Sequence, residues 1–94
     1  MVENIISDRG NAIPNQFVVK FNGATYFQSY DSVVAKYENG VVTLGPMWDF
    51  SVTTRKYLYI FLHDYCYQCR MRMDEVKAKI ESGEFLYDEN LAYA

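Results

Sequence analysis

Residues 16–44 read QFVVKFNGATYFQSYDSVVAKYENGVVTL, and this stretch decides the fold. It contains two Asn-Gly pairs, Asn22-Gly23 and Asn39-Gly40, each with apolar and aromatic runs on both sides. A two-residue type I′ turn needs positive φ at both central positions, which Asn and Gly tolerate best. The stretch therefore predicts an antiparallel β-meander.

Alternating residue types define the strands of this meander. The alternation places Phe17, Val19 and Phe21 on one face of the first strand. A further turn is expected at residues 30–32. Sequential strands joined by short turns most simply form an up-and-down sheet. We expect a sheet within residues 16–45 with four strands, at 16–21, 24–29, 33–37 and 41–44.

Helical spacing replaces the alternation after Trp48. Ser51 is the expected N-cap, with Thr53 as the alternative, because either hydroxyl can accept a hydrogen bond from a free helix amide. The segment 48–54 is expected to join sheet and helix as an aromatic staple around that cap. Apolar residues then recur at helical steps at Leu58, Phe61, Leu62, Tyr65 and Cys69. Helices are predicted over residues 52–68 and 73–82, the second closed by Gly83.

The two ends of the chain lie outside these elements. Residues 1–15 are expected to form an irregular lead-in, with a turn at residues 8–11. The tail, residues 84–94, is rich in apolar side chains, so part of it should dock on the body or on a partner. The 94 residues are too few for two independent cores. We therefore expect one α+β domain, a four-stranded antiparallel meander packed by one long and one short C-terminal helix.

Charge and hydropathy exclude some classes of protein. The formal net charge of −3 disfavours a nucleic-acid or membrane-surface binder, which usually carries a basic excess. The first residues lack the pattern of a signal peptide, and no apolar run approaches the roughly 20 residues that cross a bilayer. We therefore expect a cytoplasmic protein without a membrane partner, whose cysteines are reduced thiols.

His63, Cys66 and Cys69 have the spacing of metal ligands on a helix. A structural zinc site usually needs four ligands, so Asp64 or a second subunit would have to complete it. A redox role for the two cysteines is a further alternative, although the end of a helix disfavours a thiolate. The favoured interpretation is that the cysteines pack as small apolar residues, and no cofactor or metal is expected.

Motifs for catalysis are not found in the sequence. The chain has a single histidine, no Gly-x-Ser-x-Gly elbow and no Gly-rich phosphate loop. The carboxylates of Asp74 and Glu75 are adjacent and so diverge on a helix surface. We therefore expect a protein that is not an enzyme.

Tyrosine and arginine suggest a contact surface instead. Nine tyrosines cannot all be buried, because each hydroxyl needs a hydrogen-bond partner. Tyrosine is favoured at protein interfaces, and a basic edge that includes Lys56 alternates with several tyrosines. Such an edge can also hold a single nucleic-acid strand, but four charges in an acidic domain make that the weaker interpretation. The residues expected to contact a partner protein are Trp48, Arg55, Tyr57, Tyr59, Tyr67, Arg70 and Arg72.

Two motifs carry a family resemblance, FQSYDS at residues 27–32 and WDFSVTTRKY at residues 48–57. Gly40-x-Val42-x-Leu44 and Phe61-Leu62 accompany them. Over residues 15–62 the chain resembles a family of short, uncharacterised proteins from bacteriophages and mobile elements of gut and Gram-positive bacteria. The resemblance implies a phage context, hence the cytoplasm of a bacterial host cell, and no catalytic residues.

The expected function is that of a non-enzymatic phage accessory protein that binds and inhibits a host protein, with an anti-CRISPR-like inhibitor of bacterial immunity as the favoured case. Three alternatives remain: a small nucleic-acid-binding regulator, a self-assembling structural protein that forms homo-oligomers, and a zinc-binding or redox module through His63, Cys66 and Cys69. Salt-dependent DNA binding, light scattering and metal analysis would discriminate among them.

Overall fold

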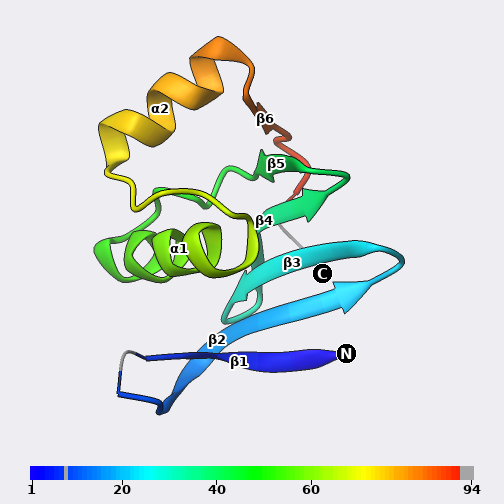
Figure 1. Ribbon diagram of the computed structural model, residues 1–94, viewed down its shortest axis with the longest axis vertical. Helices are drawn as coiled ribbons and strands as arrows, with labels where there is room; N and C mark the ends of the chain where they lie inside the picture. The colour runs from blue at the N-terminus through cyan, green and yellow to red at the C-terminus, as the bar shows by residue number, and fades with distance from the viewer. Residues whose placement is uncertain (8, 92–94) are drawn as a thin grey trace.

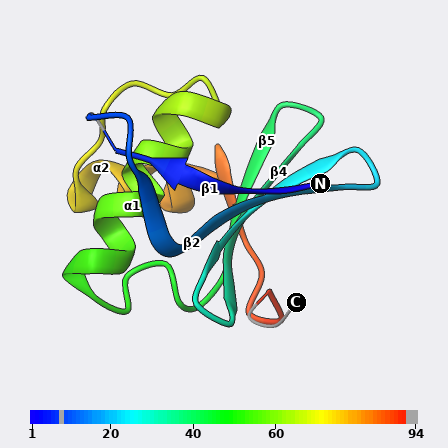
Figure 2. The same ribbon diagram turned by 90° about the horizontal axis from the view of Figure 1, so that it is seen from below.

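The computed structural model describes residues 1–7 and 9–91 and has an α+β fold (Figure 1). One sheet has the strand order β1-β2-β3-β4-β5-β6, and both helices lie on the same side of it (Figure 2). The predicted class is confirmed, but the expected count of four strands is too low. The elements are β1 Val2–Ile6, β2 Ala12–Phe21, β3 Ala24–Ser29, β4 Ser32–Glu38, β5 Val41–Leu44, α1 Val52–Tyr65, α2 Met73–Ser82 and β6 Phe85–Tyr87.

Both predicted Asn-Gly turns are present. Asn22 and Gly23 have φ values of 52° and 80°, and Asn39 and Gly40 have 53° and 77°. Positive φ at both central residues is the signature of a type I′ turn, whose twist matches that of the flanking strands. These turns fix the antiparallel registers of β2 with β3 and of β4 with β5.

Strands β1 and β6 extend the meander at its two edges. The expected irregular lead-in over residues 1–15 is wrong for residues 2–6 and 12–15, because β1 pairs antiparallel with β2 and β2 itself begins at Ala12. In the expected tail, β6 pairs parallel with β5, and the Asp88 amide donates to the Leu44 carbonyl (2.9 Å). Part of the tail docks on the body, as predicted. The expected turn at 8–11 includes Asp8, and the end of the tail includes Tyr93, both outside the described residues.

The helices cover the face of β2 opposite to its most apolar row. Val18 is fully buried and pairs with Phe27, whose ring stacks on Phe61 of α1 with centroids 5.7 Å apart. Phe17 and Phe21 share the outer face, where Phe21 is 61% exposed. The alternation was predicted correctly, but the larger side chains of this strand face away from the helices.

The main core lies between α1 and the sheet. Leu58, Phe61 and Leu62 of α1 are fully buried against the sheet. At the C-terminal end of α1, the Tyr65 hydroxyl donates a hydrogen bond to Glu3 Oε1 (3.1 Å) and so links α1 to β1. Burial and this hydrogen bond raise the pKa of Tyr65. Burial of apolar surface stabilises a fold by roughly 25 cal/mol per Å². The buried side chains of Leu58, Phe61 and Leu62 are therefore the main contribution of α1 to stability.

The second helix packs on the last strand. Val76 of α2 and Phe85 of β6 are both buried in the same core. The Arg72 amide donates to Glu75 Oε1 (3.1 Å) at the start of α2, and Gly83 ends it with φ of 84°, as predicted. A Cβ on Gly45 would collide with the backbone carbonyl of Leu91, so a glycine there lets the C-terminal segment pass close to the sheet.

Candidate functional site

Helix α1 supplies one wall of the candidate site. It begins at the predicted cap: Ser51 has extended φ and ψ, and its Oγ accepts a hydrogen bond from the Thr54 amide (3.1 Å). It ends at Tyr65, three residues before the predicted boundary. The cause is Tyr67, whose φ of 59° is left-handed, a position that usually takes glycine after a helix. The Gln68 amide then donates to the Leu62 carbonyl (3.0 Å).

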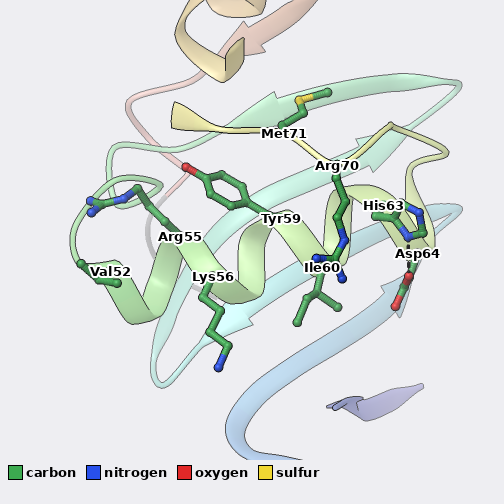
Figure 3. A pocket seen from close by; sticks show the side chains of 9 residues that line it. All are labelled: Val52, Arg55, Lys56, Tyr59, Ile60, His63, Asp64, Arg70 and Met71. Atoms are coloured by element: carbon green, nitrogen blue, oxygen red, sulfur yellow. Dashed lines mark hydrogen bonds and ion pairs between the residues drawn. The ribbon is translucent and has the colours of Figure 1, made fainter. Parts of the chain in front are cut away.

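The turn at Tyr67 leads the segment 66–72 back along α1 and leaves a groove between them. This cationic groove has a volume of about 480 Å³. Figure 3 shows Arg55, Lys56 and Tyr59 on α1, and Arg70 extending from the opposite wall towards Ile60. The full lining is Val52, Arg55, Lys56, Tyr59, Ile60, His63, Asp64, Arg70 and Met71.

The positive side chains of this groove are not paired with carboxylates of the described residues. Within the described part of the chain, Arg55, Lys56 and Arg70 form no ion pair within 4.0 Å. Arg55 Nη1 donates to the backbone carbonyl of Asp49 (3.1 Å). Among the described lining residues, Asp64 is the one carboxylate, and it accepts from His63 Nδ1 (2.8 Å) at the far end of the groove. A surface of this kind attracts anionic groups.

Tyr59 gives the groove an aromatic and partly apolar floor. Its hydroxyl is buried and has no hydrogen-bond partner among residues 1–7 and 9–91. Burial raises the pKa of this phenol, and the nearby Arg55 opposes the shift. An unpaired buried hydroxyl costs stability. Ile60 and Met71 add apolar surface beside it, so the groove can hold a side chain that combines an apolar body with a charge.

The other residues expected to contact a partner lie elsewhere. Trp48 is 6% exposed and packs in the core. Tyr57 is half-buried, with Lys56 Nζ 5.4 Å from its ring centroid. Tyr67 is 85% exposed, and its ring lies 6.3 Å from that of Tyr37. Arg72 is exposed at the start of α2 and pairs with the carboxylates there. The structure thus gathers Arg55, Tyr59 and Arg70 of the predicted set.

Ile60 and Met71 are lining residues that sequence reasoning missed. An isoleucine and a methionine carry no functional signal by themselves, and their place depends on the return of segment 66–72 along α1. Lys56 belonged to the predicted basic edge but not to the predicted contact residues. Its position one residue after Arg55 was the signal that could have found it.

The structure does not gather His63, Cys66 and Cys69 into one cluster of ligands within the described residues. Over the described ranges 1–7 and 9–91, no three His, Cys, Asp or Glu side chains gather so that they could hold a metal ion. Cys66 is buried in the core and Cys69 is exposed. Burial raises the pKa of the Cys66 thiol from 9.0 to about 12, so this thiol is protonated at neutral pH and a poor nucleophile.

Comparison with known proteins supports one part of the resemblance, namely membership of a family without an assigned function. Neither the curated proteins nor the solved structures gave a match. Among the described residues, neither helix has the length and apolar character to span a bilayer. A phage origin stays a prediction, whereas membership of an uncharacterised family is confirmed. The chain belongs to the family of unknown function DUF8033, whose model matches residues 1–79, a range that includes the whole cationic groove.

Proposed function

We propose that the protein is a non-enzymatic binding module whose cationic groove takes an acidic segment of a partner protein. The supporting observation is the gathering of Arg55, Lys56 and Arg70 around one groove without carboxylate partners in the described part of the chain. A partner that supplies two or three carboxylates would form charge-assisted hydrogen bonds with these groups. Tyr59, Ile60 and Met71 would contact the apolar part of the same segment.

A protein partner fits this groove better than a nucleic acid does. Double-stranded DNA carries one negative charge per roughly 1.7 Å of its axis. Even a short duplex therefore carries more charges than the three cations of the groove can neutralise, and most of it would lie outside the groove. Asp49 lies beside one end of the groove, Asp64 lies at the other, and the chain has a net charge of −3. These carboxylates, together with Asp74, whose charge also acts on Tyr59, would repel a long polyanion more strongly than a short acidic segment that carries fewer charges.

The test compares peptides that differ only in charge. A ten-residue peptide rich in Glu with one central Leu, and its Gln counterpart, are titrated by fluorescence anisotropy at low and at moderate salt. We expect the Glu peptide to bind more tightly and to weaken as salt rises. The variant R55E/R70E should bind it about tenfold more weakly, because two exposed ion pairs are worth about 0.7 kcal/mol each.

Lys77→Glu is the control, since Lys77 is exposed on α2 and does not line the groove. Equal affinity for both peptides, or an equal loss in K77E and R55E/R70E, would contradict the proposal. Tighter binding of a single-stranded oligonucleotide than of the Glu peptide would favour the nucleic-acid alternative.

The narrower hypothesis stays a prediction: a phage factor that inhibits a host immunity effector. Affinity capture from a bacterial host lysate with the natural chain and with R55E/R70E tests it. A defence protein should be captured by the first and lost with the second. Self-assembly also stays a prediction, and light scattering of the purified chain measures it.

A further inference from the structure

A second cleft is lined by residues of the β3–β4 turn and of the segment that leads into α1. Its volume is about 480 Å³, and it is separate from the cationic groove. Five of its lining residues carry hydroxyls on short side chains, so we call it the hydroxyl cleft. These residues are Ser29, Ser32, Ser51, Thr53 and Thr54, and Tyr30, Asp31, Val34, Met47 and Phe50 complete the lining.

Tyr30 in this cleft adopts a conformation that its residue type disfavours. Its φ is 54°, in the left-handed region that costs a bulky side chain energy and suits Gly or Asn. Neighbouring polar groups hold the backbone there: the Tyr30 amide donates to the Asn15 carbonyl (2.7 Å), and Gln28 Nε2 donates to the Tyr30 carbonyl (2.8 Å). The side chain is 59% exposed, so the fold gains little from the ring. Backbone strain at an exposed residue motivates a hypothesis of function for Tyr30.

Phe50 is a second aromatic residue whose exposure the fold does not explain. It precedes the cap Ser51, where an apolar residue usually packs back on the first turns of the helix as a staple. The staple expected here from the sequence does not form at this residue, because Phe50 is 71% exposed. Tyr30 and Phe50 are thus two exposed aromatic residues in the lining of one cleft.

The charges around the cleft disfavour ionic ligands of either sign. Asp31 is the one charged side chain that the described part of the chain contributes to the lining, and it would repel an anion. The N-terminal end of α1, a helix of 14 residues, begins at Ser51 with partial positive charge and would repel a cation. Hydroxyl groups both donate and accept hydrogen bonds. The side-chain oxygens of Ser51 and Thr54 are hydrogen-bonded to each other in this way (3.0 Å). A neutral ligand rich in hydroxyls fits all of these features.

We propose that the hydroxyl cleft binds a carbohydrate, a neutral oligosaccharide whose apolar ring faces lie against Tyr30 and Phe50 while its hydroxyls bond to the Ser, Thr and Asp31 side chains. Aromatic residues can cover the C–H face of a sugar ring, and convergent polar groups fix its orientation. The proposal does not depend on the cationic groove.

The test is a titration of isotopically labelled protein, observed by amide NMR, with maltotriose, cellotriose and triacetylchitotriose up to about 10 mM, which detects a Kd of about 1 mM. At least one trisaccharide should shift amides at residues 29–32 and 50–54. Tyr30→Asn should weaken binding at least about fivefold while the thermal midpoint stays equal or rises, because Asn accepts the left-handed backbone. Phe50→Ala should weaken binding as well.

Tyr67→Asn is the matched control, since Tyr67 is also an exposed left-handed tyrosine but does not line the cleft. It should bind the sugar like the natural chain, as should R55E/R70E. The proposal is overturned if no trisaccharide shifts these amides, or if Y30N binds like the natural chain. It is equally overturned if choline or inorganic phosphate shifts the same amides more strongly than the sugars do.

Discussion

Gln16→Met should make the protein more stable, although it removes a polar residue from the middle of a strand. Gln16 lies on the helix-facing side of β2 and is 1% exposed. Its Oε1 atom is buried and has no hydrogen-bond partner among the described residues. Methionine has a similar length and volume, and its flexible thioether adapts to the space that the amide leaves.

The magnitude follows from the unpaired atom. A buried acceptor without a partner costs about 1–3 kcal/mol, and volume-conserving exchanges in a core usually cost less than about 1.5 kcal/mol. The net gain should therefore be about 1–2 kcal/mol. A chain of this length has a total stability of roughly 5–14 kcal/mol. With a urea m-value of about 1–1.5 kcal/mol per M, the unfolding midpoint should rise by about 1 M.

Urea unfolding followed by circular dichroism measures this change, and Val18→Thr provides the reverse experiment. Val18 is fully buried two residues along the same face, and threonine has nearly its shape. The added hydroxyl should lower the free energy of unfolding by about 1–3 kcal/mol. If Q16M lowered the midpoint as V18T does, Oε1 would have a partner in the folded protein, and the reasoning would be refuted.

Further predictions concern the last strand, the helix cap and the thiols. Phe85→Ala should destabilise the protein by about 3–5 kcal/mol in urea unfolding, because Phe85 is fully buried between α2 and the sheet; a loss below 1 kcal/mol would mean that β6 is not docked. Ser51→Ala should cost about 1 kcal/mol, while Ser51→Thr should retain most of the stability. Ellman's reagent should label Cys69 in the folded protein at pH 8, and Cys66 only after unfolding. Burial keeps the Cys66 thiol neutral in the folded protein up to a higher pH than in the unfolded chain. Between about pH 9 and 12 the thiol therefore ionises mainly in the unfolded chain. Relative to Cys66→Ala, the free energy of unfolding should fall over this range by at most about 1.4 kcal/mol per pH unit.

The turns and caps could be predicted because their residue types answer a local requirement. Asn22-Gly23 and Asn39-Gly40 supply two consecutive positive φ angles, and Gly83 supplies one. Ser51 accepts the hydrogen bond of a free amide three residues later. None of these features depends on residues far away in the sequence. The hairpins, the start of α1 and both bounds of α2 could therefore be predicted from the sequence.

The edges of the sheet could not be predicted in the same way. Strand β1 has only five residues and pairs irregularly between Asn4 and Ile6. Strand β6 has three residues, and both helices separate it in the sequence from its partner β5. The face that β2 buries depends on where α1 lies and not on the size of the side chains. Tyr67 in a left-handed conformation broke the expectation for the end of α1, because a tyrosine gives no signal for it.

The candidate groove was partly predictable for a related reason. Arg55, Tyr59 and Arg70 stood out as charged and aromatic residues, but only the turn at Tyr67 places Arg70 opposite the first two. Trp48 stood out as well and lies in the core, since an aromatic ring serves a core and an interface equally well.

The parallel pairing of β6 with β5 also bears on biosynthesis. A ribosome delivers β5 well before β6, so a nascent chain presents the unpaired Val41–Leu44 edge throughout synthesis of both helices. Free, apolar strand edges pair with those of other chains. A chain truncated after Gly83, which lacks β6, should therefore be less soluble than the natural chain.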